Sequence, residues 1–142
     1  MRPNYLISIH PKHSNRIFCG QKTAELRNRP VYIPKGAKLW IYETRPTMGI
    51  VGYANVASIA RGSPAHIWKT QGQCFSLSKS EFTEYVKDRE VVSAILLSDV
   101  KPLEKPLTLE WLKQQNPLFH PPQFYYELGS KPELHNLLEF GA

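Results

Sequence analysis

Apolar and polar positions alternate in short runs along the chain, and these runs predict strands joined by short helices. A period of two residues indicates a half-buried strand, whereas apolar positions three and four residues apart indicate one face of a helix. On this basis we expect six strands, at residues 5–11, 23–28, 39–44, 49–60, 91–100 and 121–128. Helices are expected at residues 11–19, 63–70, 78–88, 108–115 and 130–140. Few of these strands are linked by helices of crossover length. An α+β fold, built as a small mixed or antiparallel β-barrel with surrounding helices, therefore fits better than a doubly wound sheet.

Capping residues support several of the predicted helix ends. Gly20 follows the first helix where a left-handed residue commonly ends a helix. Ser78 and Glu81 have the spacing of a capping box, and Ser130 and Glu133 repeat this spacing before the last helix. The boundaries of these elements are therefore supported by local chemistry as well as by the apolar pattern.

Composition and charge narrow the class of protein. The chain has 142 residues, of which 42% are hydrophobic and 21% charged, as in a single globular domain of ordinary size. The formal net charge is +6, and residues 1–40 contain eight Lys and Arg but one acidic residue, Glu25. Such a one-sided basic field attracts phosphates and other anions, although basic residues also serve solubility alone.

Other functional classes lack their usual signals in this sequence. No apolar run is long enough to span a membrane, and the N-terminus has no secretory apolar region, so we expect a cytoplasmic protein without a membrane partner. Cys19 and Cys74 are too few for a disulfide framework. His10 and His13 are poorly spaced for a metal site, and neither a P-loop nor GxGxxG is present, so we expect neither metal nor cofactor.

The stretch GQKTAELR carries a resemblance to a known family. It is similar to the G-x-K-x-x-E-x-R motif of ASCH domains, which belong to the PUA-like superfamily. The motif positions are Gly20, Lys22, Glu25 and Arg27. Further blocks resemble the family in the same order, namely LISIHPKHSNRIFCG, PKGAKLWIYETRP, GIVGYANV, GSPAHIW and PPQFYYEL.

This resemblance covers most of residues 4–128 and implies how the chain is organised. It implies a single ASCH domain over residues 1–142, with a core at 4–128 and a C-terminal helix at 130–140. The family fold is a small β-barrel with helices around it and a cleft beside the first helix.

The resemblance also implies a function related to RNA. It implies a protein with a basic cleft that is formed by the motif. The ligand of this cleft is single-stranded RNA, or a nucleoside or nucleotide with or without a modification. The alternative is a hydrolase on the same ligands, with Lys22 and Glu25 as catalytic residues: a ribonuclease, or an amidohydrolase of an N4-acylated cytidine. A third hypothesis is a regulator or DNA-binding accessory protein that uses its basic surface alone.

The amidohydrolase subgroup pairs the motif lysine with a threonine and a distant glutamate. Here Glu25 stands where that threonine is expected, and the segment QGQCFSLS offers Gln71 and Gln73 but no acid. Thr23 and Glu81 are weak substitutes. The departure counts against that activity.

The motif residues have expected places in the cleft. Gly20 allows a sharp turn out of the helix, and Lys22 is expected to reach the cleft mouth. Glu25 and Arg27, two residues apart on a strand, are expected to line one wall. Neighbouring cations favour the charged form of a carboxylate, which can then fix a cation, accept from a base amino group or act as a base. The competing interpretation is a salt bridge between Lys22 and Glu25 that only orders the turn.

Lesser candidates lie elsewhere in the sequence. Thr44 is expected on the cleft rim, and Gln123 and Tyr125 are placed to hydrogen-bond or stack on a base, unless Tyr125 is simply a half-exposed strand residue. Ser8 and His10 share a face of the first strand and are candidates to touch the cleft. The basic surface is expected to include Lys12, Arg16 and Arg29.

Overall fold

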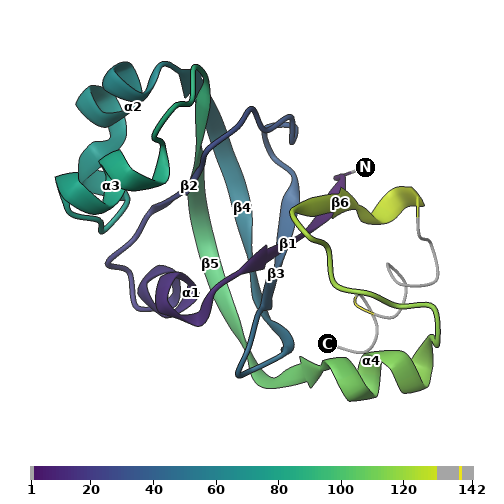
Figure 1. Cartoon of the computed structure of the whole chain (residues 1–142). Helices are drawn as coiled ribbons and strands as arrows, with labels where there is room; N and C mark the ends of the chain where they lie inside the picture. The colour runs from purple at the N-terminus through teal and green to yellow at the C-terminus, as the bar shows by residue number, and fades with distance from the viewer. Residues whose placement is uncertain (1, 131–137, 139–142) are drawn as a thin grey trace.

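The computed structural model describes residues 2–130 and Leu138. Six strands form one mixed sheet (Figure 1): β1 (Asn4–Ile9), β2 (Ala24–Arg27), β3 (Lys38–Glu43), β4 (Gly49–Gly62), β5 (Val92–Thr108) and β6 (Tyr125–Glu127). The helices are α1 (Pro11–Phe18), α2 (Pro64–Gln71), α3 (Lys79–Tyr85) and α4 (Leu109–Gln115), with short 3-10 turns η1 (Gly72–Cys74) and η2 (Leu128–Ser130). This order of elements is the predicted one. The helix expected at residues 130–140 lies outside the described residues, except for its positions 130 and 138.

The strands are ordered β2-β5-β4-β3-β1-β6 across the sheet, and β1 and β3 run parallel while the other pairs are antiparallel. The sheet curls, so its two ends approach each other. Arg27 of β2 donates from Nη2 to the Ser8 carbonyl of β1 at 2.8 Å. The Tyr32 backbone N–H donates to the hydroxyl of Tyr125 at 3.2 Å. These contacts join the ends through side chains, and the predicted barrel is therefore a half-barrel.

Alternation along the strands divides the apolar residues between the inside and the outside of the half-barrel. Inward side chains form a core that includes Tyr5, Ile7, Ile9, Leu39, Ile41, Ala54, Val56 and Ile95. On the outside of β1 and β3, Leu6 and Trp40 pack with Leu112 of α4. On the outside of β2 and β5, Ala24 packs with Ile67 of α2 and Phe82 of α3. Helices therefore cover two outer faces of the sheet and leave α1 beside the gap between β1 and β2 (Figure 1).

Strand β5 is longer than the sequence pattern predicts. The expected strand ends at residue 100, whereas β5 continues to Thr108 and pairs there with the start of β4. Pro102 and Pro106 lie in this extension and lack the N–H that a regular ladder uses. The strand continues past these prolines because its pairing with β4 shifts register between Ile50 and Gly52, and this shift places Pro102 opposite Gly52.

Gly52 provides a test of this packing. A Cβ atom at this position would lie 2.5 Å from the carbonyl oxygen of Lys101 and 2.5 Å from Cε1 of Phe18, so both the sheet and α1 require a glycine here. We expect Gly52→Ala to lower the free energy of unfolding by about 1–3 kcal/mol through overpacking. Urea denaturation would measure the change. Gly36→Ala is an informative comparison, because its Cβ has open space and its cost comes from a φ of +87° alone.

Candidate functional site

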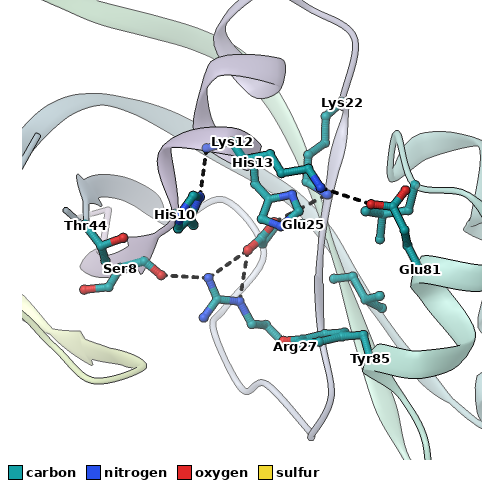
Figure 2. A pocket seen from close by; sticks show the side chains of 12 residues that line it. Ser8, His10, Lys12, His13, Lys22, Glu25, Arg27, Thr44, Glu81 and Tyr85 are labelled. Atoms are coloured by element: carbon teal, nitrogen blue, oxygen red, sulfur yellow. Dashed lines mark hydrogen bonds and ion pairs between the residues drawn. The ribbon is translucent and has the colours of Figure 1, made fainter. Parts of the chain in front are cut away.

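A cavity of about 390 Å³ opens where α1, β2 and α3 meet (Figure 2). From the strands and their ends it is lined by Ser8, His10, Lys22, Glu25, Leu26, Arg27 and Thr44. From the helical side it is lined by Lys12, His13, Leu77, Glu81 and Tyr85. Its volume lies within the range of ordinary small-molecule sites. Three of the four motif residues and Thr44 therefore meet in one cavity.

The turn between α1 and β2 sets the position of Lys22. Gly20 adopts φ +87° and donates from its N–H to the Ile17 carbonyl at 3.2 Å, which ends the helix. The Lys22 backbone N–H then donates to the Arg16 carbonyl at 3.0 Å. Gly20 itself is not among the residues that line the cavity. Its role in the structure is to reverse the chain.

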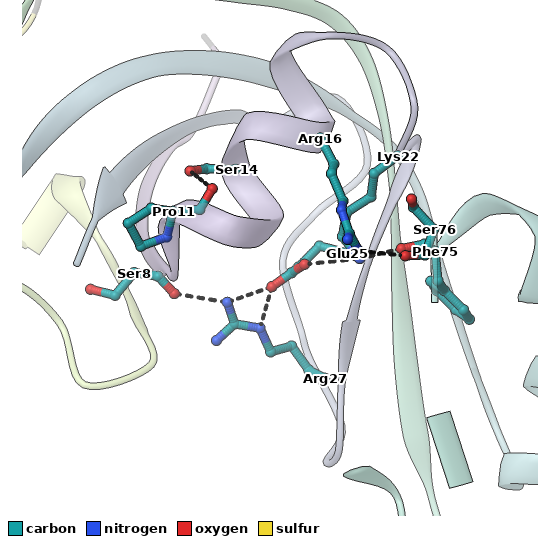
Figure 3. A network of polar contacts seen from close by, with 9 residues as sticks. All are labelled: Ser8, Pro11, Ser14, Arg16, Lys22, Glu25, Arg27, Phe75 and Ser76. Atoms are coloured by element: carbon teal, nitrogen blue, oxygen red, sulfur yellow. Dashed lines mark hydrogen bonds and ion pairs between the residues drawn. The ribbon is translucent and has the colours of Figure 1, made fainter. Parts of the chain in front are cut away.

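Lys22 is buried at the base of the cavity rather than at its mouth, where the family resemblance places it. The residue is 2% exposed, and its Nζ donates to the Phe75 carbonyl at 2.8 Å and lies 3.5 Å from Glu25 Oε1. Burial lowers the pKa of Lys22, and this effect outweighs the opposing attraction of the Glu25 carboxylate. The side chain turns inward because the segment around Phe75 offers it a carbonyl oxygen (Figure 3).

Glu25 holds two cations at once. Its Oε2 accepts from Arg27 Nη2 at 2.7 Å and from Arg27 Nε at 3.1 Å, while its Oε1 faces Lys22. Arg27 also donates from Nη2 to the Ser8 carbonyl (Figure 3). Among the described residues, no group accepts from Arg27 Nη1. We call these three residues the Lys22–Glu25–Arg27 cluster. It has an excess of positive charge and a free guanidinium edge, which suit an anionic ligand.

Two histidines at the start of α1 line the same cavity. His10 accepts from the Lys12 backbone N–H through Nδ1 at 3.0 Å, so its neutral ring carries the proton on Nε2. His13 is half-buried, and within the described part of the chain its buried Nδ1 has no hydrogen-bond partner. Burial lowers the pKa of His13, with Lys22 contributing in the same direction. Both imidazoles line the cavity, and an imidazole can accept a proton in its neutral form and donate one when it is protonated.

The expectation from the sequence that Ser8 and His10 touch the cleft agrees with the structure, but His13 and Tyr85 as lining residues are findings of the structure. For His13 the available signal is its place three residues after His10 on the helix that leads to the motif. Tyr85 lies on α3, far from the motif in sequence, and no local pattern indicates that this helix returns to the cavity.

Lys12 and Glu81 form an ion pair at the cavity rim, with Nζ and Oε2 3.1 Å apart. Glu81 also completes the predicted capping box of α3 with Ser78. The hydrogen bond from the Ser78 backbone is the largest cause that lowers the pKa of Glu81, to about 2, and Lys12 adds to it. Glu81 is therefore ionised and already paired at neutral pH, which makes it a poor general base.

A buried carboxylate also fixes α1 against the sheet. Glu43, at the end of β3, accepts from the Ser14 hydroxyl and from the Thr47 hydroxyl, each at 2.5 Å. Glu43 is 7% exposed, and Ser14 is fully buried. The bond between Ser14 and Glu43 therefore ties α1, which carries His13 and is capped by His10, to the end of β3 next to Thr44.

The remaining predicted site residues lie outside this cavity. Gln123 and Tyr125 line a second hollow of about 560 Å³, together with Arg29. Arg16 is half-buried and donates from Nη1 to the Ser76 carbonyl at 2.8 Å, so it reinforces the wall beside Lys22. Gln71 and Gln73, on α2 and η1, line neither hollow.

Residues 2–130 and Leu138, the part of the chain that the structure describes, contain neither a metal site nor a membrane-spanning helix. In this part of the chain, no three His, Cys, Asp or Glu side chains are grouped in a way that would hold a metal ion. Nor does any helix in it have the length and apolar character needed to cross a membrane.

Three comparisons place this chain among known proteins. The model of the family described as Domain of unknown function (DUF365) matches residues 6–113. The chain is 34% identical over 122 residues to an ASCH domain-containing ribonuclease of Zymomonas mobilis subsp. mobilis, a match that covers 86% of this chain and 82% of that relative.

The fold is similar to crystal structures of ASCH from Zymomonas mobilis. One of these has a TM-score of 0.86 and 32% identity, covering 96% of this chain and 94% of that one. The crystal structure of a tyrosine-to-phenylalanine mutant of the same protein, ZmASCH, is similar with a TM-score of 0.87 and 32% identity. This match covers 98% of this chain and 99% of that one. Since sequence and fold agree over nearly the whole of both chains, this protein belongs to the ASCH domain family of the PUA-like superfamily.

Proposed function

We propose that this protein binds single-stranded RNA and cleaves it in the cavity between α1, β2 and α3. The observation that carries the proposal is that the Lys22–Glu25–Arg27 cluster, with Lys22 and Glu25 buried, lines the same cavity as the imidazoles of His10 and His13. Phosphodiester cleavage needs cations that stabilise the transferring phosphoryl group, next to groups that accept and donate protons. A relative that is 34% identical is named a ribonuclease, which supports cleavage of RNA over binding alone.

The proposed reaction uses the 2′-hydroxyl of RNA as its nucleophile. The 2′-oxygen bonds to the adjacent phosphorus while the bond from phosphorus to the 5′-oxygen breaks. His13 accepts the proton of the 2′-hydroxyl. The doubly protonated ring of His10 donates its Nε2 proton to the leaving 5′-oxygen and becomes neutral in the same step. Lys22 and Arg27 stabilise the negative charge that develops on the phosphoryl oxygens, and Glu25 positions both cations. The products are a 2′,3′-cyclic phosphate and a 5′-hydroxyl, so atoms and protons balance.

A cleavage assay tests this function. Purified protein would be incubated with an RNA hexanucleotide and with the same hexanucleotide carrying 2′-deoxyribose throughout, and the products would be read by mass spectrometry. We expect a cyclic phosphate product from the RNA and none from the deoxy strand. Saturable binding of both strands without product would instead make the protein an RNA or nucleoside reader. Release of acetate from N4-acetylcytidine, included as a third substrate, would favour the amidohydrolase.

The pH dependence of cleavage distinguishes His13 from an ordinary surface histidine. Burial lowers the pKa of His13 below its usual 6.5, so the neutral, proton-accepting form persists at more acidic pH. We expect the acidic limb of the rate profile to have its midpoint below pH 6.5 and to disappear in His13→Asn. A midpoint above 6.5, or an unchanged limb in the variant, would assign the base to another group. Circular dichroism at each pH would show that the fold persists.

A further inference from the structure

The second hollow, formed by Arg29 and residues 120–126, is not used in the proposed reaction. It is a shallow depression of about 560 Å³ with aromatic side chains and an exposed arginine. We define it as the aromatic hollow. It lies where the loop after β2 meets the segment that leads into β6, at the open side of the half-barrel.

The aromatic hollow adjoins the cavity directly. Ser8, which lines the cavity, donates from Oγ to the Pro122 carbonyl at 2.6 Å and from its backbone N–H to the Phe124 carbonyl at 3.2 Å. Arg27 has its guanidinium carbon 5.4 Å from the centroid of the Phe124 ring while its nitrogens bind Glu25. A ligand that contacts Arg27 in the cavity is therefore beside the Phe124 ring.

The chemistry of the aromatic hollow suits a nucleobase. The Arg29 guanidinium lies 3.9 Å from the Phe124 centroid, so a planar cation and an aromatic ring are already stacked there. Arg29 is exposed, Phe124 is half-buried, and the Gln123 amide is exposed beside them. Stacking on aromatic and guanidinium planes, with hydrogen bonds from an amide, is how proteins hold unstacked bases of single-stranded RNA.

We propose that the aromatic hollow is a subsite that stacks the base of the nucleotide next to the scissile phosphate. The inference rests on the proposed function for the identity of the strand. The nucleotide in the cavity and its neighbour in the hollow would share the phosphate that contacts Arg27 Nη1. The substrate class is then a single strand of at least two nucleotides, because a paired base would first have to be unpaired and unstacked before it could enter the hollow.

The test separates stacking from general attraction. A hexanucleotide carrying 2′-deoxyribose throughout would report binding without cleavage. Matched versions would carry an abasic sugar at one position at a time. In the wild type we expect the abasic sugar at one position of the strand to weaken binding about tenfold, as the loss of one stacked base does. Phe124→Leu, which keeps an apolar side chain in the core, should weaken the intact strand by a similar factor. It should remove the difference between intact and abasic strands.

Arg29→Gln and a charge control complete the design. Arg29→Gln should lower the affinity for the intact strand more than the affinity for the abasic strand, because the variant loses a stacking plane as well as a charge. Lys105→Gln removes the same charge from an exposed site on β5 and should affect both strands equally and weakly.

Equal affinities of the wild type for intact and abasic strands would overturn the subsite. So would unchanged affinities in Phe124→Leu and Arg29→Gln. Normal stacking in these experiments without cleavage of RNA would leave the subsite standing and overturn the proposed reaction alone. No binding of any strand would overturn both.

Discussion

Lys22→Met is expected to lower the rate of RNA cleavage by about 10²–10³-fold, the usual loss on removing one preorganised donor from a transition state. Lys22 is held at the base of the cavity by the Phe75 carbonyl and Glu25, so its charge needs no rearrangement to meet a developing oxyanion. Methionine keeps the volume of the side chain but supplies no charge. Single-turnover cleavage of the RNA hexanucleotide, compared between wild type and variant, would measure the loss.

The fold should survive this change. Glu25 keeps both hydrogen bonds from Arg27, so no buried charge is left alone. The Phe75 carbonyl loses its donor, at a cost of about 1–3 kcal/mol in the free energy of unfolding. Lys105→Met, at an exposed position on β5, is the matched control and should cleave like the wild type. A Lys22→Met variant that folds and cleaves at more than a tenth of the wild-type rate would remove Lys22 from the reaction.

The architecture follows from the sequence because its signals are local. Periodicity and capping residues such as Ser78 predict each described helix near its observed bounds, and the predicted order of elements along the chain is correct. The interior of the cavity does not follow in this way. Lys22 turns inward because of a carbonyl at Phe75, and Tyr85 reaches the cavity from α3. Both contacts join segments more than fifty residues apart, where periodicity carries no information.

The extension of β5 illustrates the same limit. Prolines at positions 102 and 106 predict an end to the strand, and yet β5 continues because β4 shifts register opposite them. The tertiary pairing overrides the local preference. Tertiary structure also separates Gln123 and Tyr125 from the motif residues. By residue type all of them are plausible ligand contacts, but in the curled sheet they line two adjoining hollows.

Glu25→Gln is expected to have the largest effect on stability. The substitution keeps the shape of the side chain but leaves Lys22 buried without its carboxylate, and removing one partner from a buried ion pair costs about 3–5 kcal/mol in the free energy of unfolding. Arg27 keeps its bond to the Ser8 carbonyl and is partly exposed, so most of the cost arises at Lys22. Urea denaturation would measure the loss, with Glu104→Gln as the control at an exposed carboxylate.

The cause of this loss can be separated from simple disruption of the site. If an uncompensated lysine charge destabilises Glu25→Gln, then adding Lys22→Met should restore stability, so that the double variant is more stable than the sum of the single losses by about 0.5–3 kcal/mol. Raising the pH should also restore stability to Glu25→Gln, because it removes the charge of Lys22. The folded state already lowers the pKa of Lys22 below its usual 10.5 by burial, and losing Glu25 lowers it further.

Between the folded and unfolded pKa values of Lys22, the unfolded state binds more protons, so stability rises with pH across that window. The deficit of Glu25→Gln relative to the wild type should therefore shrink as the pH approaches 10.5. A deficit that is constant with pH, and additive with Lys22→Met, would mean that Glu25 supports the fold by packing alone. The cluster would then be a structural feature of the turn, as the simple salt-bridge interpretation holds, and not a preorganised pair of cations for a phosphate.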